Sequence, residues 1–98
     1  MHAFLTVRKL KGGSYDAWRR AWEPDEWPQG SKKAYILRNV DDPDEIIAFG
    51  FFDTDLETLR NDPQLREQQR LRFERMAPHV EVTGTDGMYE VIDEVTPQ

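Results

Sequence analysis

The chain has 98 residues, of which 33% are charged and 38% hydrophobic, with a formal net charge of −6 and no cysteine. This length allows one folded domain with a modest core, and the aromatic residues scattered along the chain exclude a disordered or low-complexity protein. The acidic balance argues against nucleic acid or an anionic membrane surface as a partner, and the lack of cysteine excludes disulfides, thiolate metal sites and a cysteine nucleophile.

A strand followed by a helix is predicted at the start of the chain. Residues 3–10 mix apolar and β-branched side chains and end before a pair of glycines, which is typical of a strand. Residues 14–23 then predict a short helix, because a serine suits its N-cap and a proline follows it. Tyr15, Trp18 and Trp22 recur at helical spacing, so this helix has an aromatic face.

Two further strands are predicted to form a hairpin. Residues 32–40 and 45–52 are the strands, and the DDPD sequence at residues 41–44 has the aspartate and proline of a tight turn. The second strand is apolar at successive positions, whereas a strand with one face in water alternates apolar and polar residues. We therefore expect both faces of this strand to be covered.

The second half of the chain predicts a helical region. Residues 53–60 read as one or two helical turns, and a new helix begins where Asp62 serves as the N-cap and Pro63 takes the first helical position. Pro78 ends this helix, which carries an apolar stripe with one glutamine in it. The stripe comprises Leu65, Gln69, Phe73 and Met76.

Five arginines lie mostly off this stripe. Glu67 and Glu74 are interleaved with them, and Arg70 stands four residues before Glu74. This spacing predicts a solvated, ion-paired helix face and not an anion site. The five are Arg60, Arg66, Arg70, Arg72 and Arg75.

The end of the chain completes a recognisable element order. Gly84 and Gly87 are predicted to bracket a turn, and residues 88–95 to form the last strand. The order strand, helix, strand, strand, helix, strand closes most simply as one ferredoxin-like domain over residues 1–98. Its four antiparallel strands place the first and third at the centre and both helices on one face. The other face then needs a second subunit, which predicts a homodimer.

This order, with an apolar central strand leading into a kinked second helix, resembles the dimeric α/β-barrel superfamily that includes antibiotic-biosynthesis-type monooxygenases. There, two ferredoxin-like sheets pack face to face across a two-fold axis, which implies that the bare face of residues 45–52 is buried in a dimer. The resemblance covers nearly the whole chain and is architectural. Members include cofactor-independent oxygenases of aromatic substrates, haem-degrading enzymes, lactone isomerases and proteins of unassigned role, so the fold alone does not select a reaction.

Haem degradation is the minor alternative within this resemblance. Those relatives use an asparagine, a tryptophan and a histidine around the porphyrin, and this chain has Asn39, three tryptophans and His79. No tryptophan lies on the third strand or the second long helix, however, and the histidine follows that helix. None of the roles transfers by position, and we expect no cofactor.

His79 is the candidate catalytic residue. An imidazole titrates near neutral pH and transfers protons, and a histidine directly after Pro78 would face a cavity mouth if Phe73 and Met76 line the cavity wall. The alternative is that His79 interacts with backbone carbonyls at the end of a helix, where donors and positive charge are favoured.

The aromatic residues predict a flat apolar cavity between the helices and the sheet. Trp18, Trp22, Phe73 and Met76 would line it, and Trp27, in a loop between two prolines, would form its lid. The alternative for Trp18 and Trp22 is that they fill the core, as aromatic residues at helical spacing usually do. The further ligand-binding candidates lie on the strands of the hairpin and are Tyr35, Asn39, Phe49 and Phe51.

These observations predict a homodimer that binds a small apolar or aromatic molecule and oxidises it with dioxygen. The competing interpretation is a non-catalytic dimeric module that binds a ligand or a partner protein. No metal-ligand motif, phosphate-binding loop or hydrolase motif is present in the sequence. No leader or membrane-spanning segment is visible, so we expect a cytoplasmic protein without a membrane partner.

Overall fold

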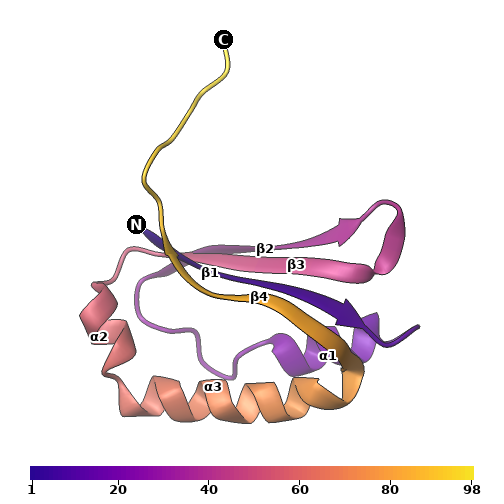
Figure 1. The fold of residues 1–98 in the computed structure, drawn as a ribbon. Coiled ribbons are helices and arrows are strands. Elements are labelled where there is room, and N and C mark those ends of the chain that lie inside the picture. The colour runs from indigo at the N-terminus through magenta and orange to yellow at the C-terminus, as the bar shows by residue number, and fades with distance from the viewer.

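The computed structural model describes residues 1–98 as a four-stranded antiparallel sheet with its helices on one face (Figure 1). The strand order β2-β3-β1-β4 places the first and third strands at the centre, which confirms the predicted ferredoxin-like fold. No helix is both long and apolar enough to cross a membrane. The elements are β1 (His2–Leu10), α1 (Tyr15–Trp22), β2 (Ser31–Asn39), β3 (Asp42–Phe52), α2 (Leu56–Arg60), α3 (Pro63–Met76), the 3-10 turn η1 (Ala77–His79) and β4 (Val80–Glu90).

The strand register decides which side chains meet the helices. Thr6 on β1 lies opposite Ala48 on β3 and Asp86 on β4. Because successive side chains of a strand point to opposite faces, the apolar run of β3 divides into two sets. Ile46 and Ala48 are buried under the helices, whereas the ring of Phe49 lies on the other face with that of Tyr35. The helices therefore account for the first of these apolar sets and not for the second.

The core lies between α1, the end of α3 and the centre of the sheet. Trp18 is fully buried there and belongs to one apolar cluster with Leu10, Ile46 and Met76. The ring centroid of Trp22, one helical turn later, is 6.1 Å from that of Trp18. The aromatic spacing of the sequence therefore corresponds to the inner face of α1.

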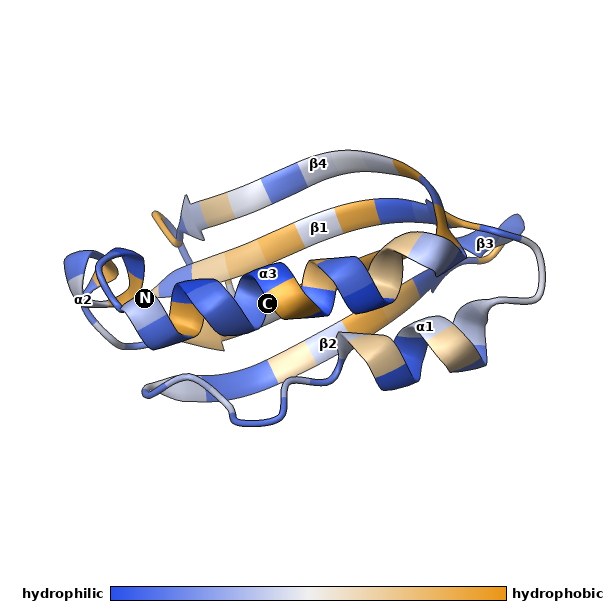
Figure 2. Cartoon of the chain, turned by 90° about the horizontal axis from the view of Figure 1, so that it is seen from below, coloured by the Kyte–Doolittle hydropathy of each residue, from blue (hydrophilic) through white to orange (hydrophobic).

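The start of α3 follows the prediction. Asp62 Oδ1 accepts hydrogen bonds from the backbone N–H groups of Gln64 at 2.9 Å and Leu65 at 3.3 Å, and Pro63 takes the first helical position. Figure 2 shows α3 crossing the sheet with mostly hydrophilic residues and a few hydrophobic ones. At α1, Ser14 occupies the predicted N-cap position, although its side chain makes no capping hydrogen bond.

The β2–β3 hairpin is tighter than predicted. Its loop consists of Val40 and Asp41 alone, because β3 already begins at Asp42. Asn39 Oδ1 accepts a hydrogen bond from the backbone N–H of Asp41 at 2.8 Å, which is an Asx turn. The side chain of Lys9 donates a hydrogen bond to Asp42 and thereby holds the pKa of that carboxyl below its usual range.

The turn predicted between Gly84 and Gly87 is wrong, because β4 runs through both residues. Asp86 lies opposite Thr6 and Thr83 lies opposite Arg8. Two residues of β4, Gly84 and Thr85, therefore stand opposite the single residue Val7 of β1, which is a β-bulge. A Cβ atom on Gly84 would lie 3.5 Å from the carbonyl oxygen of Val7. A glycine inside a strand marks such a close approach as readily as it marks a turn.

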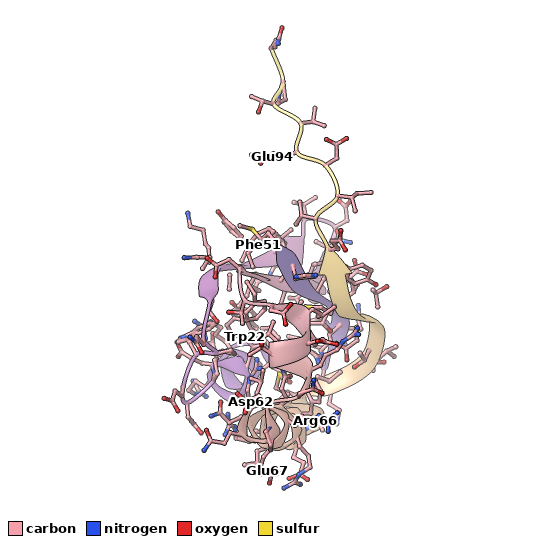
Figure 3. All side chains as sticks on the ribbon, turned by 90° about the vertical axis from the view of Figure 1, so that its left-hand side faces the viewer. Trp22, Phe51, Asp62, Arg66, Glu67 and Glu94 are labelled. Atoms are coloured by element: carbon pink, nitrogen blue, oxygen red, sulfur yellow. The ribbon has the colours of Figure 1, made fainter.

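The final strand also ends earlier than predicted for residues 88–95. Regular structure stops at Glu90, and residues 91–98 form a tail without helix or strand. The tail leaves the sheet on the side away from the helices, and Glu94 projects far from α3 (Figures 1 and 3). Its exposed apolar side chains are Val91, Ile92 and Val95.

The sheet face opposite the helices is apolar and uncovered in one chain; we call it the open face. Phe49 stands at the centre of an aromatic cluster, with its ring centroid 5.4 Å from that of Tyr35 and 5.6 Å from that of Phe51. Tyr35 is 44% exposed and Tyr89, on β4, is 49% exposed. A second copy that covers this face stays a prediction.

Candidate functional site

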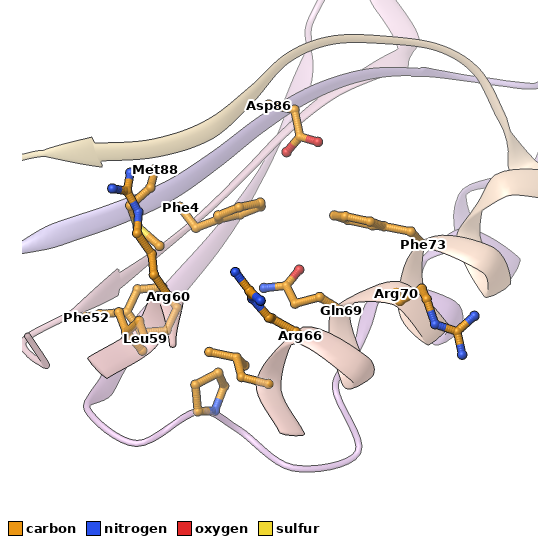
Figure 4. Close-up of a pocket in the computed structure, with 12 residues that line it drawn as sticks. Phe4, Phe52, Leu59, Arg60, Arg66, Gln69, Arg70, Phe73, Asp86 and Met88 are labelled. Carbon is orange, nitrogen blue, oxygen red and sulfur yellow. The ribbon is translucent and has the colours of Figure 1, made fainter. Parts of the chain in front are cut away.

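A pocket of about 640 Å³ lies between the helix side of the sheet and the helices α2 and α3 (Figure 4). We call it the outer pocket. Its volume falls in the range of about 300–1,000 Å³ that is usual for small-molecule sites. The apolar lining includes Phe4, Phe52, Leu59, Phe73 and Met88. The polar lining consists of Arg60, Arg66, Gln69, Arg70 and Asp86.

The register of the sheet and the pitch of α3 assemble this pocket. Phe4 on β1 pairs with Met88 on β4, so the two side chains project side by side toward the helices. Phe52, at the end of β3, lines the same pocket. Gln69 and Phe73 stand one helical turn apart on α3 and project from one side of that helix. The pocket therefore has walls from three strands and from α3.

The arginines at the mouth of the pocket differ in their partners. Arg70 forms ion pairs with Glu67 at 2.5 Å and Glu74 at 2.6 Å, and Figure 4 shows it turned away from the other labelled side chains. For Arg70, the predicted ion-paired helix face is thus confirmed. Arg60 and Arg66 are exposed and have no acidic side chain within 4.0 Å. Figure 4 shows Arg66 pointing from α3 into the pocket.

A smaller cavity of about 60 Å³ lies next to the outer pocket. We call it the inner cavity. The two share lining residues, among them Phe4, Gln69 and Phe73, so Gln69 stands at their junction. The hydroxyl oxygen of Thr6 and the side-chain oxygen of Gln69 are both buried there without a hydrogen-bond partner. Buried polar atoms without partners are rare in folded proteins.

Arg8 lines the inner cavity from the sheet side. Its side chain projects from the helix face of β1, is 5% exposed, and holds its guanidinium carbon 5.6 Å from the ring centroid of Phe73. No acidic side chain lies within 4.0 Å of it. Burial lowers the pKa of Arg8, and the more distant charge of Asp86 only partly offsets this. Arg8 is therefore a buried cation without an ion pair.

Arg72 lines the same cavity from α3. Its Nε donates a hydrogen bond to the backbone oxygen of Trp22 at 2.7 Å. Burial, followed by the positive charges of Arg8 and Arg75, lowers the pKa of Arg72 to about 10. The side chain is thus still a cation at neutral pH. The predicted solvated arginine face is wrong for Arg72, because this residue turns toward α1 and the sheet.

The structure brings several predicted ligand-binding residues together. Phe73 lines both the outer pocket and the inner cavity. Four more border the inner cavity, although the ring of Phe49 stacks with Tyr35 on the open face. These four are Trp22, Trp27, Phe49 and Met76.

The other predicted ligand-binding residues lie elsewhere. Trp18 is fully buried in the core. Tyr35 and Phe51 belong to the aromatic cluster of the open face, and Phe51 also borders a shallow cavity near Trp27. Asn39 donates a hydrogen bond to Glu45 at 3.0 Å at the hairpin end of the sheet. A ligand in the outer pocket therefore has no contact with this second group in a single chain.

His79 lies in η1, beyond the end of α3. It is half-buried, its backbone oxygen accepts a hydrogen bond from Lys11 at 3.0 Å, and it lines neither the outer pocket nor the inner cavity. Proton transfer by His79 stays a prediction. If it holds, His79→Ala will lower turnover by at least about 100-fold, the lower range for a general acid or base, without changing the melting temperature. Full turnover with an earlier melting transition would assign the residue to the packing of η1.

The residues that sequence reasoning missed share one signal. Phe4, Thr6, Arg8 and Leu10 alternate along β1, so an arginine falls in register with apolar residues that face the helices. A charged residue on the apolar face of a central strand is unusual and points to a special environment. Among histidine, aspartate and glutamate side chains, no group of three or more is arranged to hold a metal ion.

No protein-family model matches the sequence, and no curated protein sequence matches it. Solved structures do match the fold. A variant of SnoaB, a cofactor-independent oxygenase from Streptomyces nogalater, has a TM-score of 0.70 and 13% identity, with 98% of this chain and 97% of that chain covered. A candidate antibiotic biosynthesis monooxygenase from Chloroflexus aurantiacus has a TM-score of 0.67 and 12% identity, with 97% and 96% covered. This chain has the antibiotic-monooxygenase fold.

The resemblance predicted from the element order is thereby confirmed at the level of the fold. An uncharacterised NIPSNAP domain protein from Burkholderia xenovorans also has this fold, with a TM-score of 0.58, 15% identity and 100% of each chain covered. At such low identity the shared architecture says nothing about individual residues. The function must therefore be argued from the pocket of this chain.

Proposed function

We propose that the protein binds a small, mostly apolar, ring-containing molecule in the outer pocket and oxidises it with dioxygen, without a bound cofactor. The observation that carries this proposal is the outer pocket, which combines an aromatic and aliphatic lining with polar side chains from α2, α3 and β4. The activity given for SnoaB, a cofactor-independent oxygenase with the same fold, supports this class of reaction. In such a reaction the electrons come from the substrate, so the protein contributes positioning, exclusion of water and stabilisation of the deprotonated substrate.

The binding half of this proposal is tested by filling the pocket. Met88 is half-buried and lines the outer pocket, whereas the neighbouring Tyr89 faces the opposite side of the sheet. We expect a naphthalene derivative to bind the natural protein in a calorimeter and to raise its melting temperature, because it binds the folded state alone. In Met88→Trp the larger side chain will occupy the space of the ligand and weaken this binding at least about tenfold. That factor corresponds to the loss of one good apolar contact.

Tyr89→Trp is the matched control, because it adds an indole to the same strand on the other face. It will leave the affinity unchanged. Equal affinity in the natural protein and in Met88→Trp would mean that the ligand binds elsewhere, and the outer pocket would lose its assignment.

A non-catalytic ligand-binding module is the second candidate. The observation in its favour is that neither an imidazole nor a tyrosine hydroxyl lines the outer pocket or the inner cavity, which leaves the carboxylate of the exposed Asp86 as the one conventional acid–base group there. Oxygen uptake distinguishes the two functions. A phenolic or enolic ligand that binds without consuming dioxygen would favour the module.

We further propose that two copies pack through the open face. The aromatic cluster of Tyr35, Phe49 and Phe51 exposes apolar surface that a second copy of the same face would bury. The tail of residues 91–98 supports this arrangement, because it extends past the open face with exposed apolar side chains (Figure 1). A second sheet stacked on that face would lie within reach of the tail.

A further inference from the structure

We propose that the inner cavity binds an ionised oxygen of the ligand, that of a carboxylate, phenol or enol, between Arg8 and Arg72. The inference rests on the proposed function for the apolar body of the ligand, which would lie in the outer pocket. It adds the chemical class of the ligand, an acidic ring compound bound as its anion. It also gives a role to two arginines that form no ion pair within the chain.

The first support is the absence of a counter-ion at Arg8. A buried charge without a partner is unfavourable, and apolar residues of similar volume often replace buried charges without loss of stability. Arg8 is 5% exposed and has no acidic side chain within 4.0 Å. Its closest influence of opposite sign, Asp86, is an exposed residue of β4. Because an apolar side chain of similar volume is often at least as stable in such a position, packing alone does not account for the charge.

The second support is the position of Arg72 across the cavity. Arg8 comes from the sheet and Arg72 from α3, and the positive charge of Arg8 adds to burial in lowering the pKa of Arg72. An anion bound between them would relieve both the repulsion and the burial of two unpaired charges. Guanidinium groups also present several N–H donors in a plane, which suits a carboxylate or an enolate.

The third support is the polar lining and the size of the inner cavity. Thr6 offers a buried hydroxyl without a partner, which would donate to an anionic oxygen. The cavity measures about 60 Å³, and about 10–15 Å³ already accommodates a water molecule. A carboxylate or enolate therefore fits, whereas an aromatic ring system does not. Because Gln69 and Phe73 line both spaces, the anionic end and the apolar body of one ligand would occupy adjoining sites.

Two neighbouring cations would also affect reactivity. Opposite charge within a few ångströms lowers the pKa of an acidic group. A phenol or enol held between Arg8 and Arg72 would therefore be bound in its deprotonated form, which is the electron-rich form that donates electrons to dioxygen. In this arrangement the arginines orient and stabilise the anion, and they do not remove the proton themselves.

The test compares two probes of similar shape, naphthoate and the neutral naphthalenemethanol, by calorimetry at fixed ionic strength. We expect the natural protein to prefer naphthoate by at least about tenfold, the effect of one charge-assisted hydrogen bond. Arg8→Met will abolish this preference, and the melting temperature of the ligand-free variant will be unchanged or higher, because an unpaired buried charge has been removed. Arg8→Gln, which is neutral but polar, serves the same comparison if the methionine variant does not fold.

Arg66→Met is the matched control, because Arg66 is an exposed arginine of the outer pocket. It will keep most of the preference for naphthoate. Loss of the preference in Arg66→Met but not in Arg8→Met would place the anion at the mouth and overturn the inference. Equal binding of the two probes by the natural protein would overturn the inference while leaving the proposed function intact, and binding of neither probe would overturn both.

Discussion

Replacing Phe49 with aspartate will prevent dimerisation and will lower the stability of the fold. In the proposed dimer, Phe49 lies at the centre of the buried open face, between the rings of Tyr35 and Phe51. A carboxylate placed there would be buried without a partner, which is unfavourable by several kcal/mol for each copy. Light scattering at micromolar concentration will give twice the chain mass of 11.5 kDa for the natural protein and the single mass for Phe49→Asp.

The control for this substitution introduces the same charge at an exposed loop position outside the aromatic cluster. Val40, in the two-residue loop of the β2–β3 hairpin, is 95% exposed. Val40→Asp will leave both the mass and the melting temperature unchanged. A natural protein that is a stable monomer at these concentrations would refute the dimer, and the open face would then require another cover.

Replacing Trp18 with alanine will have the largest effect on the stability of the single chain. Trp18 is fully buried between Tyr15 and Trp22, with ring centroids 5.9 and 6.1 Å away. Removing a buried tryptophan side chain leaves a cavity and typically costs about 3–5 kcal/mol. A domain of this size is stable by only about 5–15 kcal/mol. Calorimetry at fixed protein concentration will therefore show a melting temperature lower by more than about 10 °C, or no transition at all.

Trp27→Ala is the control for Trp18→Ala, because it removes an indole that is not buried. Trp27 is 49% exposed and contacts Trp22 edge-on, with the ring centroids 5.9 Å apart. We expect its removal to change stability by no more than about 1 kcal/mol, as is usual for surface positions. If the two alanine variants melt at the same temperature, Trp18 does not hold the core as described. In that case its role as a ligand-binding residue would regain support.

The sequence by itself determined the order and type of the elements. The helical spacing of Trp18 and Trp22 and the pair Asp62-Pro63 rest on local rules of periodicity and capping, which act within a few residues. The apolar run of β3 likewise indicated a central strand, which is the position that β3 occupies. Each of these signals lies within a single element, so it can be recognised before the contacts between elements are known. They led to the ferredoxin-like fold that the solved structures share.

The tertiary structure alone decided the extent of β4. Gly84 and Gly87 carry the same local signal in a turn and in a bulged strand. Only the pairing with β1 distinguishes the two cases, because Thr6 and Arg8 find their partners on either side of Gly84 and Thr85. Long-range pairing therefore outweighed the turn preference of the glycines.

The site, too, was decided by contacts between distant segments. From the sequence alone, Arg72 is indistinguishable from the solvated arginines of α3. In the fold it lies beside α1 and donates a hydrogen bond to the backbone carbonyl of Trp22, 50 residues away in the chain. Arg8 and Arg72 face one cavity only because β1 lies under α3. Helical spacing predicts which residues share a face, but not which face meets which strand. Burial and distance from acidic side chains, which turn two ordinary arginines into a candidate anion site, are properties of the assembled fold.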